Sequence, residues 1–113
     1  MLRANRDWII GLECRGTEII LHPGQKSFAV AALEDGSSAT ALASTLRDLI
    51  ARRQASVLPG QPPYRPLLRF LVWPNGLRGY YDAYPLLEGL RLPMGRVDIH
   101  SNDELRRALY PGA

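Results

Sequence analysis

The first segment with a regular apolar pattern is WIIGLEC, residues 8–14. Its residues alternate between two faces, as they do in a β-strand. Ile9, Gly11 and Glu13 fall on one face. The other face, which we expect to meet the core, carries Trp8, Ile10, Leu12 and Cys14.

A second strand and a weaker third one follow. Arg15-Gly16 is typical of a tight turn, and TEIILH, residues 17–22, supplies another β-branched run before Pro23-Gly24. The pattern predicts a β-hairpin. SFAV, residues 27–30, predicts a third, weaker strand, which ends before Asp35-Gly36.

From Ala39 the apolar spacing changes to three and four residues, which predicts one helix over residues 39–53. Ser37 or Ser38 is placed to cap it, and Arg52 and Arg53 fall in its last turn, where cations complement the helix dipole. The predicted apolar stripe consists of Ala39, Leu42, Ala43, Leu46, Leu49 and Ile50.

The next segment, residues 54–66 (QASVLPGQPPYRP), is rich in proline. Proline lacks an N–H and has a fixed φ, so we expect a loop here rather than a helix interior or a central strand. Loops usually span about 4–6 residues, so this one is either functional or a stiff crossover at one end of the sheet. A groove for extended proline-type ligands is the functional alternative.

Residues 67–73 are apolar on both faces except at Arg69, which predicts a central strand covered on both sides. Pro74-Asn75-Gly76 ends it, and we expect Asn-Gly to supply the positive φ of a sharp exit. A helix is predicted over residues 77–89, with a kink or restart at Pro85. The residues expected on its inner or boundary face are Leu77, Tyr80, Tyr81, Tyr84, Leu87 and Leu90.

A last strand is predicted over residues 95–100, with Val97 and Ile99 inside, followed by a short helix over 101–110 capped by Ser101 or Asn102. The element order is then β-β-(β)-α-β-α-β-(α). We therefore predict an α+β fold with a small mixed β-sheet of four to five strands and two main helices on one face. Residues 1–113 form a single domain, with the proline-rich loop inside it.

Composition and charge narrow the function classes. The net charge of +3 comes from one lysine and thirteen arginines that are scattered along the chain, so we expect no nucleic-acid partner. No apolar run approaches the length of a transmembrane helix, and the N-terminus lacks the apolar region of a signal peptide. We therefore expect no membrane insertion by this chain itself.

Catalytic chemistry has few candidates. Cys14 falls on the predicted core face, where a thiol is inert packing, and His22 and His100 are predicted to make hydrogen bonds at strand boundaries. Asp82 and Glu88 lie on nearly opposite faces of the predicted helix, and no phosphate-binding or serine-hydrolase motif is present. We expect no enzyme, no catalytic residues, no cofactor and no metal site.

The segment LLRFLVWPNGLRGYYDAYPLLEGL, followed by PMGRVDI, resembles the extracytoplasmic domain of the ExbD/TolR biopolymer-transport family. The likeness lies in the order strand, polar turn, tyrosine, amphipathic helix, glycine and strand. Asn75 stands where the family commonly has an acidic residue, and Tyr80 or Tyr81 stands at the family's tyrosine. WIIGLECRGTEIILHPG and the helix after it fit the first half of that domain.

The resemblance implies a small dimerising domain that contacts partners in the cell envelope. The family's transmembrane helix and proton-carrying aspartate are absent from this sequence, so the chain itself would not harvest a proton gradient. If the chain is an excised part of a longer membrane-associated protein, the resemblance implies a periplasmic or envelope location. A chain complete as given would be cytoplasmic.

Aromatic residues with arginine are typical of protein interfaces. The turn and helix after the central strand carry such a set, and we predict there a surface for a homodimer or another protein partner. Its residues are Trp73, Asn75, Arg78, Tyr80 and Tyr81. The first function hypothesis is thus a non-enzymatic interaction or scaffold domain. The alternative is a small enzyme or nucleic-acid-binding domain, which a pocket joining Cys14 to a histidine, or one arginine-rich face, would favour.

Overall fold

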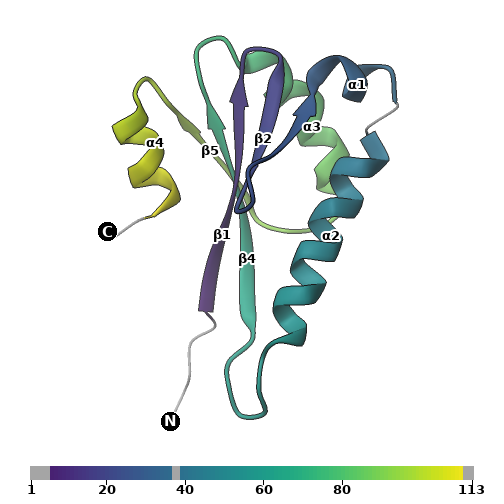
Figure 1. Ribbon diagram of the computed structural model, residues 1–113, viewed down its shortest axis with the longest axis vertical. Coiled ribbons are helices and arrows are strands. Elements are labelled where there is room, and N and C mark those ends of the chain that lie inside the picture. Colours follow the sequence, from purple (N-terminus) through teal and green to yellow (C-terminus); the bar gives the residue numbers. More distant parts are fainter. Residues whose placement is uncertain (1–5, 37–38, 111–113) are drawn as a thin grey trace.

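The computed structural model describes residues 6–36 and 39–110, and its strands form one five-stranded mixed sheet (Figure 1). The strands are β1 (Arg6–Arg15), β2 (Glu18–His22), β3 (Lys26–Ala29), β4 (Tyr64–Val72) and β5 (Met94–Asp98). Their order across the sheet is β3-β2-β1-β4-β5. The predicted α+β fold with a small mixed sheet is confirmed.

Strand β1 joins an antiparallel half of the sheet to a parallel half. β1 and β2 form the predicted hairpin, with Gly11 opposite His22 and Arg15 opposite Glu18. β3 pairs antiparallel with β2. On its other side β1 pairs in parallel with β4, and β4 pairs in parallel with β5. Both parallel connections contain a helix, as is usual for the long crossovers that parallel strands require.

The two main helices pack on one face of the sheet, which we call the first face, as predicted. They are α2 (Ala39–Ala55) and α3 (Leu77–Glu88), and the short α1 (Val30–Glu34) precedes them. The predicted core side chains of β1 are buried beneath these helices, together with Phe70 of β4 and Leu46 of α2. Ser37 and Ser38, the predicted caps of α2, lie outside the described residues.

The terminal helix α4 (Asn102–Leu109) packs on the opposite, second face. There it covers Leu71 and Ile99, apolar side chains that would otherwise face solvent. Nη1 of Arg69 donates a hydrogen bond to the carbonyl of Ala108 at 2.8 Å, which fixes the end of α4 to β4. The predicted Ser101 cap is confirmed, because its hydroxyl accepts the N–H of Glu104 at 3.1 Å.

The proline-rich loop is shorter than predicted. α2 continues to Ala55 and β4 begins at Tyr64, so Pro66 lies inside a strand that is central over most of its length. The prediction that proline excludes a strand here was wrong for a local reason. β5 pairs with β4 only from Leu68 onward, so at Pro66 the strand has one neighbour and tolerates a missing N–H.

The rest of the loop is held by specific contacts. The side-chain amide of Gln54 donates to the carbonyl of Tyr64 at 2.6 Å, and its oxygen accepts the N–H of Tyr64 at 3.1 Å. At the tip, Gly60 has φ +86°, and Gln61 donates its N–H to the carbonyl of Leu58. The loop therefore makes a defined turn that presents Leu58 to solvent.

None of the helices in the described part of the chain combines the length and the apolar character needed to cross a membrane.

Candidate protein-interaction surface

The Pro74-Asn75-Gly76 turn connects β4 to α3 by a close approach to the β1–β2 hairpin. Oδ1 of Asn75 accepts the N–H of Gly16 at 3.0 Å. Gly76 has φ −109°, and neither it nor Asn75 has the positive φ that we predicted. The glycine is needed for space instead, because a Cβ there would lie 1.9 Å from the carbonyl oxygen of Cys14. Asn75 therefore stabilises this turn through its hydrogen bond to the hairpin.

Trp73 is held in a buried polar network on the second face. Its indole N–H donates to Oε2 of Glu13 at 2.7 Å, and Oε1 of Glu13 lies 3.1 Å from Nε2 of His22. Glu13 is only 4% exposed. A buried carboxylate requires such partners. The guanidinium of Arg15 lies 4.7 Å from the centroid of the Trp73 ring and covers it from outside.

Sequence reasoning missed this network. It placed Glu13 on the face of its strand opposite to the expected core face and His22 at a strand boundary, without pairing them. A glutamate enclosed between Leu12 and Cys14 in an apolar run was the available signal, because a buried acid needs a partner.

Arg78, which belongs to the predicted surface, joins two helices. Its guanidinium forms two hydrogen bonds with the carboxylate of Glu34, both 2.5 Å, and so connects α3 to α1. This hydrogen bonding lowers the pKa of Glu34. Asp82, one turn further along α3, shares a hydrogen bond with Glu34, and this contact raises the pKa of Asp82.

Tyr80 and Tyr81 are brought together, and they differ in exposure. The ring of Tyr80 packs edge-on against Phe70, with centroids 5.1 Å apart, and is partly buried. The ring of Tyr81 lies 5.3 Å from that of Tyr80 and is 62% exposed. Arg96 of β5 places its guanidinium 4.8 Å from the centroid of Tyr80, a cation–π distance. Arg96 is not among the residues predicted for this surface from the sequence.

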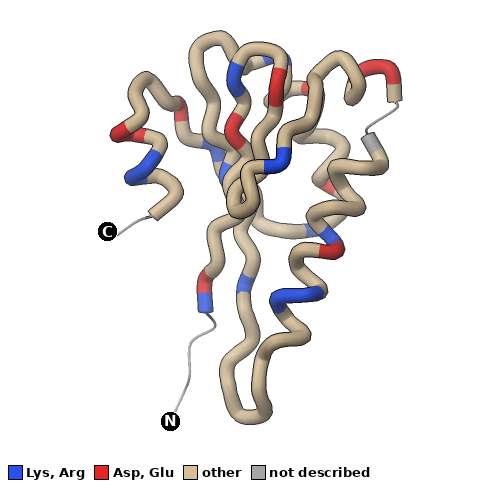
Figure 2. The backbone as a smooth tube through the Cα atoms, in the orientation of Figure 1, with Lys and Arg blue, Asp and Glu red and all other residues tan. Residues whose placement is uncertain are grey.

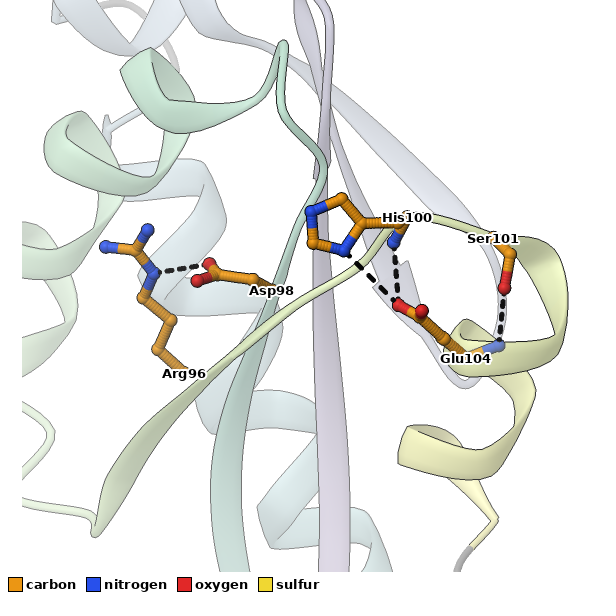
Figure 3. Close-up of polar contacts among 5 residues, drawn as sticks. All are labelled: Arg96, Asp98, His100, Ser101 and Glu104. Atoms are coloured by element: carbon orange, nitrogen blue, oxygen red, sulfur yellow. Dashed lines mark hydrogen bonds and ion pairs between the residues drawn. The ribbon is translucent and has the colours of Figure 1, made fainter.

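Arg96 begins a row of polar side chains that follows β5 and the start of α4 (Figure 3). Nε of Arg96 donates to Asp98 at 2.9 Å, and this bond raises the pKa of Arg96. His100 donates its backbone N–H to Oε2 of Glu104 at 2.8 Å, and its Nδ1 lies 3.5 Å from the same oxygen. In Figure 3 the Asp98 carboxylate lies between Arg96 and the His100 ring.

A cavity of about 200 Å³ connects this row to the end of β4. Its lining residues are Val72, Trp73, Pro74, Leu77, Arg96, Asp98 and His100. Leu77, in the first turn of α3, is 39% exposed beside it. We call the set Leu77, Tyr80, Tyr81, Arg96 and Asp98 the α3–β5 surface. Of the predicted surface residues it includes the two tyrosines, but not Asn75 and Arg78. Trp73 lies next to it, because Trp73 lines the same cavity.

The candidate Cys–His nucleophile pair does not form. Cys14 is fully buried on the first face, and burial raises the pKa of its thiol to about 12. His22 bonds to Glu13, the neighbour of Cys14 that points to the second face. Within residues 6–36 and 39–110, no group of three potential metal ligands comes together. Figure 2 shows the lysine and arginine residues spread over several helices and strands.

Comparisons of this chain with protein-family models, with curated proteins and with solved structures found no match. The resemblance to the ExbD/TolR domain therefore stays a prediction from the sequence.

Proposed function

We propose that this chain is a protein-interaction domain without catalytic activity of its own, and that it binds a protein partner through the α3–β5 surface. The observation that carries the proposal is the exposure of Tyr81 and Leu77 beside Arg96 and a cavity. Tyrosine and arginine dominate the energetics of protein interfaces, because each combines a large contact area with polar groups.

The position of the surface in the sheet supports the same function. β5 is an outermost strand, so the α3–β5 surface borders an open sheet edge. Arg96 and Asp98 neutralise one another there, and the cation–π contact fixes Arg96 in place before a partner arrives. A preorganised side chain loses less entropy on binding.

The resemblance to the ExbD/TolR extracytoplasmic domain supports an interaction role as well, since those domains contact other envelope proteins. On this proposal the partner is either a second copy of the chain or another envelope protein. A crosslinking experiment distinguishes the two cases by the adduct that forms.

A photo-crosslinking amino acid placed at Tyr81, in the chain expressed in its own cell, tests the proposal. The matched control is the same amino acid at Leu58, which is also 62% exposed and lies on the remote loop tip. We expect adducts from position 81 and none from position 58. An adduct containing two copies of the chain identifies a homodimer, and an adduct with another protein identifies that partner.

Affinity measurements with the purified partner complete the test. Truncation of an aromatic hot spot costs about 2 kcal/mol or more, so Tyr81→Ala should weaken binding by at least about tenfold. Leu58→Ala should leave the affinity unchanged. Equal crosslinking at the two positions, or an affinity insensitive to Tyr81→Ala, would show that the surface is not an interface.

A further inference from the structure

The lower half of β1 has a free edge, because β2 is much shorter than β1. β2 pairs with β1 only from Gly11 to Arg15, whereas β4 pairs with β1 from Arg6 to Cys14. In Figure 1 the lower ends of β1 and β4 extend beyond β2 and β3. Among the described strands, β1 therefore has a neighbour on one side only from residue 6 to residue 10.

The backbone groups that face this free edge belong to Asp7 and Ile9. The N–H of Arg6 donates to the carbonyl of Pro63 at 3.1 Å, and the carbonyl of Cys14 accepts the N–H of Trp73 at 3.0 Å. The even-numbered residues of β1 thus face β4, and alternation turns the odd-numbered ones the other way. Among the described residues, no strand pairs with Asp7 or Ile9 on that side.

A groove of about 540 Å³ lies beside this edge. Both Asp7 and Ile9 line it. Its other walls come from the end of β2, from Leu67 and Arg69 of β4, from Arg53 of α2, and from the end of α4. The groove thus combines an unpaired strand edge with side chains from four other elements.

Two arginines make the groove electropositive. The guanidinium of Arg53 lies 5.0 Å from the centroid of Trp8 and 4.6 Å from that of Tyr64, so two rings hold it in place. Arg69 uses one N–H for the carbonyl of Ala108 and is partly buried. Within the described part of the chain neither arginine forms an ion pair, whereas Asp7 is already paired with Arg65 at 3.1 Å.

We infer that this groove binds an extended, acidic segment of a partner protein by strand addition. The segment forms backbone hydrogen bonds with Asp7 and Ile9, and its carboxylates contact Arg53 and Arg69. Strand addition supplies affinity through main-chain hydrogen bonds, while flanking pockets and charges supply specificity. A basic segment is disfavoured, because it would place its cations beside two arginines that lack counterions. This site is separate from the α3–β5 surface.

A fluorescein-labelled heptapeptide of alternating threonine and valine, ending in two aspartates, is a suitable probe. We expect saturable binding by fluorescence anisotropy, with the largest amide shifts in NMR spectra at Asp7 and Ile9. A peptide that ends in two lysines, or one methylated at alternate backbone nitrogens, should not bind. Equal binding of either control peptide, or no binding of the acidic peptide up to about 1 mM, would overturn the inference.

Charge-reversal variants at two adjacent arginines distinguish binding at the groove from attraction to the general surface charge. Arg53→Glu should lower the affinity for the acidic peptide by about tenfold, because it reverses a charge at the groove. Arg52→Glu is the matched control, since Arg52 is exposed on the same helix and does not line the groove, and its effect should stay within about twofold. Equal effects of the two variants would overturn the inference.

A backbone variant tests the strand edge directly. Asp7→Pro removes an N–H that faces the groove and spares the ladder to β4, so it should abolish binding, while Asp7→Ala should retain it. Circular dichroism checks that both variants fold. Amide shifts confined to α3 and β5 would assign the peptide to the other surface and overturn the inference for β1. Concentration-dependent shifts at Asp7 and Ile9 without peptide would identify a second copy of this chain as the occupant and overturn it as well.

Discussion

At the scale of single residues, the glycines at the two ends of α3 differ in how closely other atoms surround them. Gly76 lies where the backbone of Cys14 leaves no room for a side chain. Gly89 follows the helix with φ −63° and ψ −17°, and nothing lies within 4 Å of the position of its missing Cβ. The sequence shows two similar glycines, and only the packing distinguishes them.

Alanine substitutions measure this difference. Gly76→Ala should lower the free energy of unfolding by about 3 kcal/mol, because the new methyl group collides with backbone that has no alternative position. Gly89→Ala should raise it by about 0.5 kcal/mol, because alanine restricts the unfolded chain at a helical φ and ψ. Urea denaturation of both variants checks the prediction. Similar values for the two would show that the turn adapts to the added methyl group.

Cys14 is expected to be chemically silent in the folded chain. Burial raises the pKa of its thiol to about 12, so the thiolate is nearly absent at pH 8. A disulfide reagent at pH 8 should therefore react with the native protein only as fast as the protein unfolds, and at once in urea. Rapid labelling of the native protein would contradict the burial of this residue.

At the scale of elements, the sequence predicts what periodicity and local turns determine. The hairpin, the three longer helices and the strands on either side of α3 are found where they were predicted. What it could not predict depends on contacts between distant residues, such as the pairing of Glu13 with Trp73 and the packing of α4 on the second face. The predicted restart at Pro85 does not occur, because α3 is one helix from Leu77 to Glu88. Pro85 is exposed, so water can reach the carbonyl that loses its partner.

The α3–β5 surface shares Tyr80 and Tyr81 with the surface predicted from the sequence. Tyr80 and Tyr81 could be named because aromatic residues cluster in the sequence. Arg96 could not, because it reaches Tyr80 from another strand. The pairing of Arg78 with Glu34 could not be predicted either, because the two residues lie far apart in the sequence.

The hydrogen bond that caps α4 should stabilise this helix specifically. Ser101→Ala removes the acceptor of the Glu104 N–H and should cost about 1 kcal/mol, lost mainly from α4. Hydrogen exchange should accelerate in residues 102–109 and over Leu71, which α4 covers. Asn102→Ala, one residue further along, is the control and should change little. Equal acceleration throughout the sheet would mean that α4 does not open independently.

We expect the contact between α1 and α3 to depend on pH. Because its folded pKa is lowered, Glu34 contributes stability above its unfolded pKa of about 4.5, and this contribution is lost as the pH falls through the folded pKa. Arg78→Met should raise the pKa of Glu34 and flatten the loss of stability below pH 4.5. Arg52→Met is the control. The NMR titration of the Glu34 carboxyl group measures the shift, and an unchanged pKa would exclude Arg78 as its cause.

At the scale of the whole molecule, the chain has two candidate interaction surfaces on different strands. The α3–β5 surface borders one outermost strand, and the groove lies along the free part of β1. With extents of 46 × 31 × 20 Å, the molecule is elongated enough to keep the two apart. We therefore expect a partner at Tyr81 and an acidic peptide at Asp7 to bind together. A competition titration tests this, and mutual exclusion would contradict two independent surfaces.

The parallel ladders on both sides of β4 also determine how the molecule would bear mechanical force. β1 enters the sheet at the end opposite to that where β5 leaves it, so tension between the chain's two ends slides neighbouring strands lengthwise instead of peeling them apart. β5 holds β4 through five registered pairs, and β1 holds it through nine. A stretched molecule should first release α4 and β5, and then resist at the longer ladder.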